Sequence, residues 1–202
     1  MLNKIQNFVK RKDGVAAVEF AILAPLMLTM YVGTVEAGNF LSVNMKVTNT
    51  AATLADLVAR APHIDDSSMD LMFEAVDIIM RPADVSEMEV VVTSLVAVTV
   101  SGELKYQVRW SNSANGNATA RTIDSFVEIP TTSVPPVLIG GIIVMSELSY
   151  TYQPVIEGAP GFGAILHGGI EMVDIFFDSP RNDKFWRCAT FNNEGQCDTN
   201  EF

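Results

Sequence analysis

The chain has 202 residues and is acidic, with 13 lysines and arginines against 24 aspartates and glutamates and a formal net charge of −11. An acidic surface repels nucleic acid and anionic lipid, so neither is expected as a ligand of the soluble part. The length leaves room for one modest domain beside an anchor.

A basic leader and a long apolar segment come first in the chain. Four lysines and arginines lie within residues 1–14, and the following segment Val15–Val35 carries a single charge, at Glu19. A bilayer core of about 30 Å takes about 20 helical residues, so this segment is predicted to span a membrane once. Because the next basic residue is Lys46, the positive-inside rule predicts a cytoplasmic leader and an external C-terminal part.

Three fates of the apolar segment fit the sequence. It can be an uncleaved signal anchor, or a secretory signal peptide cut among the small residues of Thr34–Gly38. It can also be cut before the apolar run, after Gly14, which makes Val15 the first residue of the mature chain. Glu19 needs an explanation in any of them, because a charged side chain within a membrane segment costs about 3 kcal/mol and usually marks a function.

The residues around Gly14 resemble the processing site of type IV-like prepilins. The stretch Gly14–Phe20 has the glycine after which a prepilin peptidase cuts, and Glu19 then becomes the fifth residue. The longer stretch Arg11–Leu26 is similar to the TadE family of minor pseudopilins, which belong to tight-adherence (Flp) pilus systems. Near the far end, Asp178–Arg181 is similar to a Pro-Arg element that often closes such domains.

This resemblance implies a structural protein and not an enzyme. It implies a minor pilin or pseudopilin in the bacterial inner membrane, with a single span, a periplasmic C-terminal domain and incorporation into the pilus. The implied partners are the membrane, a prepilin peptidase, other pilins and pseudopilins, and pilus assembly proteins.

The resemblance also gives Glu19, with Phe20 beside it, a role in assembly. In related pilins the glutamate meets the α-amino group of a neighbouring subunit. The residues alone leave a second possibility open, because Val15 and Glu19 of one subunit lie one helical turn apart and can neutralise each other.

Helical character continues beyond the membrane segment, so that one helix is predicted over residues 15–60. Its length is about 69 Å at the helical rise of about 1.5 Å per residue, with bends expected at Pro25 and Gly33. It should end near Arg60, because Pro62 disfavours the helical conformation in the residue before it. Apolar positions recur along one face at Phe40, Leu41, Val47, Ala51, Leu54 and Val58. This stripe can cover the chain's own domain, a partner helix, or both along different parts.

Residues 61–202 are expected to form the periplasmic domain, of class α+β. A helix is predicted to start at Asp65–Ser68 and to end at Arg81-Pro82. Strands are predicted over Val90–Val100, Leu104–Trp110, Ile142–Gln153 and Glu171–Phe177. Turn and loop signals occur at Ser101-Gly102, Ser111–Thr119, Phe126–Val137 and Pro154–Gly169. An antiparallel sheet with helices on one face satisfies this order.

The sequence predicts no catalytic residue, cofactor or metal site. Neither His63 nor His167 accompanies a recognisable nucleophile motif, and no nucleotide-binding or metal-binding spacing occurs. Cys188 and Cys197 lie nine positions apart without the CxxC spacing of a zinc or redox site. In an oxidising compartment they are expected to form a disulfide, the alternative being two unpaired thiols.

A different class of function stays open beside the pilin interpretation. A single-span periplasmic enzyme or binding module with an uncleaved signal anchor has the same order of leader, span and domain. That alternative leaves Gly14 and Glu19 without a role. The mass of the mature chain separates the two interpretations, because only the pilin loses residues 1–14.

Overall fold

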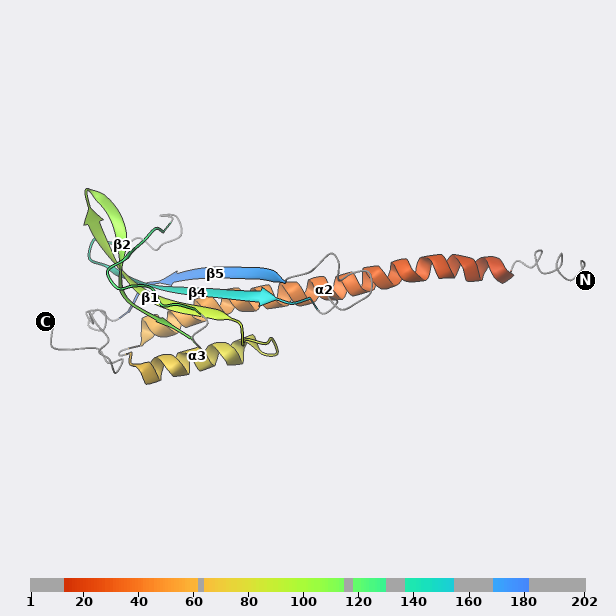
Figure 1. Cartoon of the computed structure of the whole chain (residues 1–202), viewed down its shortest axis with the longest axis horizontal. Coiled ribbons are helices and arrows are strands. Elements are labelled where there is room, and N and C mark those ends of the chain that lie inside the picture. The colour runs from red at the N-terminus through yellow and green to blue at the C-terminus, as the bar shows by residue number, and fades with distance from the viewer. Residues whose placement is uncertain (1–12, 62–63, 115–117, 130–136, 155–168, 182–202) are drawn as a thin grey trace, which may run out of the picture. The chain divides into compact units, whose positions relative to one another are not determined.

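The computed structural model describes residues 13–61, 64–114, 118–129, 137–154 and 169–181 (Figure 1). Within them are helices α2 (Asp13–Arg60) and α3 (Asp66–Met80) and strands β1 (Glu89–Val100), β2 (Glu103–Ser113), β3 (Phe126–Val127), β4 (Ile142–Tyr152) and β5 (Ile170–Asp178). The predicted class is confirmed, because a long N-terminal apolar helix is followed by a second helix and an antiparallel sheet.

Helix α2 is shared between two compact units of the chain. Its residues up to Leu41 belong to the first unit, and its residues from Ser42 onward belong to the second, together with α3 and the sheet. The predicted helix end at Arg60 is confirmed.

The sheet has the strand order β3-β2-β1-β4-β5, and every neighbouring pair is antiparallel. The predicted turn at Ser101-Gly102 connects β1 to β2, and both residues have positive φ angles, of 54° and 87°. A glycine adopts this left-handed conformation without the steric cost of a Cβ atom, which suits a tight hairpin.

The second part of α2 packs on one face of the sheet through a mostly small-residue stripe. The buried residues of this stripe are Val47, Thr50, Ala51, Leu54, Ala55, Val58 and Ala59. The predicted apolar stripe is therefore confirmed from Val47 onward, whereas Leu41 is 57% exposed. Small side chains let a helix backbone approach the strands closely, and Leu54 and Val58 fill the remaining space.

Helix α3 covers the same face of the sheet as α2 (Figure 1). Its predicted start is confirmed, because the Asp65 carboxylate caps the helix by accepting a hydrogen bond of 2.8 Å from the Ser68 backbone N–H. The side chains that α3 buries are Met69, Phe73, Val76 and Met80. The two helices are joined at the end of α3, where Lys46 Nζ donates to the Arg81 carbonyl at 2.6 Å.

A β-bulge divides the buried residues of β2 between the two faces of the sheet. Ser94 pairs with Trp110 while the next residue, Leu95, pairs with Val108, so Arg109 is an extra residue in β2. Side chains of paired residues lie on the same face, and Ser94 and Leu95 lie on opposite ones. Trp110 therefore shares the face of Ser94, and Val108 lies on the other face.

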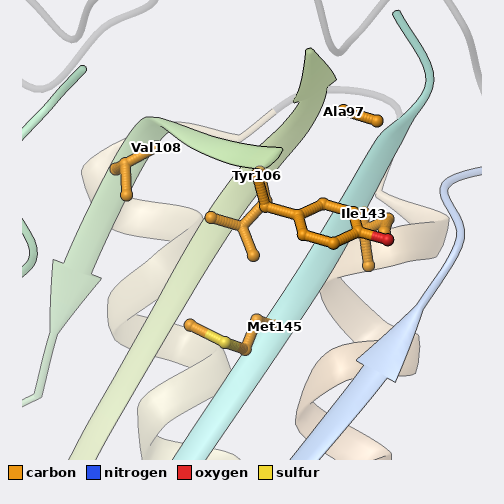
Figure 2. Close-up of a cluster of buried hydrophobic side chains, with 6 residues drawn as sticks. Ala97, Tyr106, Val108, Ile143 and Met145 are labelled. Carbon is orange, nitrogen blue, oxygen red and sulfur yellow. The ribbon is translucent and has the colours of Figure 1, made fainter. Parts of the chain in front are cut away.

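A second core fills the face that the helices leave open. Its buried members are Leu95, Ala97, Tyr106, Val108, Ile143 and Met145, and Val127, Ile129, Val137 and Phe177 pack against them. Figure 2 shows labelled members of this cluster on one side of the strands, with the helices behind. The sheet thus has apolar cores on both faces.

Two predicted loops were partly wrong because cross-strand pairing extends the sheet into them. Strand β2 continues through Ser111 to Ser113, where Thr93 Oγ1 and Ser111 Oγ lie 2.9 Å apart. Phe126 and Val127 form the short strand β3 opposite Gln107 and Tyr106. Local turn preference predicted loops here, and tertiary pairing overrode it.

An ion pair fastens the segment after β2 across the sheet. Arg121 Nε donates to Glu147 Oε2 at 2.8 Å, and its terminal nitrogen donates to Oε1 at 2.6 Å, which is a bidentate arrangement. The hydrogen bonds to Glu147 raise the pKa of the Arg121 guanidinium. The backbone N–H of Arg121 also donates to Ser111 Oγ at 3.0 Å, so this segment is held to both β2 and β4.

The Pro-Arg element after β5 closes on the end of α2. The Arg181 backbone N–H donates to the Ala59 carbonyl at 3.1 Å, which satisfies one of the free carbonyls at a helix terminus. The Arg181 guanidinium lies 3.6 Å from Asp56 Oδ1. Farther along the helix, Thr48 Oγ1 donates to Asp174 Oδ2 of β5 at 2.5 Å.

Leu54→Ala tests the packing of α2 on the sheet. Leu54 is 1% exposed, so we expect its truncation to lower the free energy of unfolding by about 2–5 kcal/mol. The control is Leu57→Ala on the same helix, where the side chain is 38% exposed and the loss should be under about 1 kcal/mol. Urea unfolding of the full chain in detergent, followed by near-ultraviolet circular dichroism, measures both. Equal losses would show that the stripe does not carry the packing.

Candidate processing and assembly site

The first part of α2 presents a continuous apolar surface. The exposed large apolar side chains before residue 36 are Val15, Val18, Phe20, Ile22, Leu23, Leu26, Met27, Leu28, Met30, Tyr31 and Val35. Among the described residues, α2 is the one helix that is long and apolar enough to cross a membrane. Bare apolar surface of this extent needs lipid or other apolar helices around it, and this fits a single-pass membrane protein.

Two threonines within this surface keep their hydroxyl groups bonded inside the helix. Thr29 Oγ1 donates to the Leu26 carbonyl at 2.8 Å, and Thr34 Oγ1 donates to the Met30 carbonyl at 2.8 Å. In hydrocarbon every polar group needs a partner of this kind. The sequence prediction did not single out these residues, although a threonine three or four positions after a helical carbonyl is the usual signal.

Gly14 lies in the first turn of α2, and the fold places no demand on it. A Cβ atom built there would meet no other atom within 4 Å. Among the described residues, packing therefore does not require a glycine at this position. The next residue, Val15, is 66% exposed.

Glu19 and Phe20 follow Val15 on the next turn of the same helix. Both side chains are exposed, Phe20 to 70%. Residues four apart on a helix are neighbours, so Glu19 and Val15 lie on the same face of α2, one turn apart. Cleavage after Gly14 would turn the backbone nitrogen of Val15 into a cationic amine, and the Glu19 carboxylate would then have an opposite charge one turn away.

The other predicted site residues separate into two groups. Pro25 and Gly33 both lie inside α2, and Pro25 has no N–H to offer the carbonyl one turn earlier, at Ala21. Cys188 and Cys197 lie outside the described residues.

The second unit holds an open acidic groove between α3 and the end of β2. It has a volume of about 260 Å³ and is lined by Asp70, Phe73, Glu74, Asp77, Ser113 and Ala114. Its chemistry is limited to attracting cationic groups, because the lining contains carboxylates and one hydroxyl but no basic side chain.

Comparison with known protein families agrees with the geometry of α2. Residues 14–56 match the model of a family described as TadE-like protein. The match begins at the glycine of the candidate processing site and ends within the stripe that packs on the sheet. The resemblance to TadE-like proteins is confirmed, and with the apolar helix it fits a membrane protein associated with tight-adherence pili. No curated protein and no solved structure matches the chain.

Proposed function

We propose that this chain is a minor pilin or pseudopilin that takes part in assembling a tight-adherence (Flp-type) pilus. A prepilin peptidase cuts it after Gly14, and the mature chain begins at Val15. The helix then anchors it in the bacterial inner membrane, with residues 61–202 in the periplasm, and delivers it to other pilins and pilus assembly proteins.

The observation that carries this proposal is that the TadE-like match starts at Gly14, directly before the exposed apolar part of α2. Packing within the described residues does not require a glycine at that position. The match covers residues 14–56, the helix surface before residue 36 is exposed, and Gly14 has no steric role in the fold. An ordinary signal anchor explains the apolar surface but gives neither Gly14 nor Glu19 a purpose.

The charge distribution supports the proposed orientation. The basic residues before α2 lie on the leader, and removal of residues 1–14 leaves nine basic and 23 acidic residues. The mature chain thus carries a net charge of −14, and the excess of basic residues on one side of the span favours the cytoplasm for that side.

Gly14→Val tests the processing step. A branched side chain next to the scissile bond should block the approach of the peptidase, so the variant should keep residues 1–14 and have the mass of the uncut chain. Gly38→Val is the matched control, since a Cβ atom at Gly38 also meets nothing within 4 Å. Intact-mass measurement of both proteins from the native host decides the question. A Gly14→Val protein of mature mass would refute cleavage at this position.

Glu19→Ala tests the assembly role. We expect the variant to remain in the membrane with its second unit folded, while its incorporation into pili or their assembly complex falls about tenfold, because an unpaired amine stays at the edge of the hydrocarbon. Glu103→Ala, at an exposed glutamate far along the chain, should assemble normally. Quantitative blotting of membrane and pilus fractions measures the ratio. Normal incorporation of Glu19→Ala would remove the assembly role from this residue.

The proposal includes a disulfide between Cys188 and Cys197 in the periplasm. Closing a short loop of this kind typically adds about 2–3 kcal/mol to stability. Alkylation of the protein from its native compartment should label both cysteines only after reduction, with mass spectrometry counting the labels. Two labels without reductant would show free thiols.

A further inference from the structure

Strand β5 forms one edge of the sheet along its whole length. It pairs with β4 from Ile170 to Asp178 without a register shift, and within the described part of the chain no strand pairs with its other edge. An antiparallel edge of nine residues presents a row of backbone N–H and C=O groups that can pair with another chain. The opposite edge of the sheet is different, because it ends in the two-residue strand β3.

Lysine, proline and a bulge, which commonly protect an edge strand, are all missing from β5, and its charged side chains are the carboxylates of Glu171, Asp174 and Asp178. The strand has the sequence Ile-Glu-Met-Val-Asp-Ile-Phe-Phe-Asp. It also exposes large apolar side chains on both faces. Val173 and Ile175 are 60% and 44% exposed on one face, and Ile170 and Phe176 are 39% and 40% exposed on the other.

The polar side chains of β5 indicate what kind of chain would fit. Glu171 and Asp178 lie near the two ends of the strand, and both are carboxylates. They are seven positions apart in the extended strand, or about 23 Å, and this odd spacing places them on opposite faces of the sheet. All three carboxylates accept a hydrogen bond, Glu171 from Ser149 Oγ at 3.3 Å, Asp174 from Thr48 Oγ1 at 2.5 Å and Asp178 from the Ser179 backbone N–H at 2.7 Å. These donors are neutral, so they do not offset the negative charges at the two ends of the strand. A strand that carries lysine or arginine near each end would therefore meet an opposite charge at both ends of β5.

The same charges argue against a second copy of this chain as the occupant. Antiparallel pairing of β5 with itself brings the acidic ends of the two strands together, and like charges across a strand pair are destabilising. No basic residue of the strand offsets this repulsion.

We propose that the free edge of β5 accepts an extended segment of another protein, with alternating apolar residues and a basic residue near each end, as a sixth strand of the sheet. Backbone hydrogen bonds supply much of the affinity in this mode, and the side chains on alternate positions supply the selectivity. The added strand would cover Val173 and Ile175 on one face and Phe176 on the other. The inference does not depend on cleavage after Gly14 or on the pilus role.

The experiment uses the full chain in detergent and two synthetic peptides. One is Lys-Val-Thr-Val-Thr-Val-Thr-Lys, in which the lysines are seven positions apart and so lie on opposite faces of an extended strand, as Glu171 and Asp178 do. The other has glutamate in place of both lysines. We expect the lysine peptide to bind and to slow hydrogen exchange of the β5 amides, and the glutamate peptide to bind at least about tenfold more weakly. The double variant Glu171→Lys/Asp178→Lys should reverse the preference between the peptides.

Matched variants separate edge binding from general attraction to an acidic protein. Ile175→Lys should weaken the lysine peptide about tenfold, because a lysine on an edge strand opposes pairing. Leu104→Lys makes the same change at a leucine that is 44% exposed on β2 and should leave the affinity within about twofold. Near-ultraviolet circular dichroism checks that both variants keep the fold.

Three results with a binding peptide or a self-associating chain would overturn the proposal, and a fourth would be the absence of any binding. The first three are binding without protection of β5, equal losses from Ile175→Lys and Leu104→Lys, and self-association of the chain through β5 in place of peptide binding. Failure of all peptides to bind would do the same, while leaving the proposed pilus function to its own tests of processing and incorporation.

Discussion

One constraint governs this chain: α2 must satisfy two different surroundings along a single uninterrupted helix. Before residue 36 its exposed surface is apolar apart from Glu19, and its threonine hydroxyls bond to their own backbone, which suits hydrocarbon. From Val47 onward only one face is buried, and small residues, three of them alanines, make up most of that face. These two parts of α2 belong to two different units of the chain, which meet between Leu41 and Ser42 of the helix sequence.

Holding that second part requires more than apolar burial. Thr48 donates to Asp174 of β5, Lys46 donates to the Arg81 carbonyl after α3, and the Arg181 N–H donates to the Ala59 carbonyl near the end of α2. The close packing also lowers the free energy of unfolding, because the hydroxyls of Thr50, Ser94 and Ser146 are buried without a hydrogen-bond partner. Each such group typically costs about 1–3 kcal/mol. Small side chains at these positions let the helix approach the strands, and the apolar area gained around them offsets this loss.

The sheet packs apolar side chains on both of its faces, and not only on the face that the helices cover. The bulge at Arg109 lets Trp110 fill the helix side while Tyr106 and Val108 build a second core on the other side. The Arg121–Glu147 pair then fixes the segment that borders that second core.

The sequence by itself determined what depends on neighbours a few positions apart. Helical periodicity and Pro62 set the end of α2, Asp65 set the start of α3, alternation located the strands, and the stretch Gly14–Phe20 located the candidate processing site. Only the tertiary structure decided which strands pair, and that fixed the bulge, the face of Trp110, the two-residue strand β3 and the free edge of β5. The physical reason is separation along the chain, since Thr48 and Asp174 are 126 positions apart and no local preference encodes their meeting.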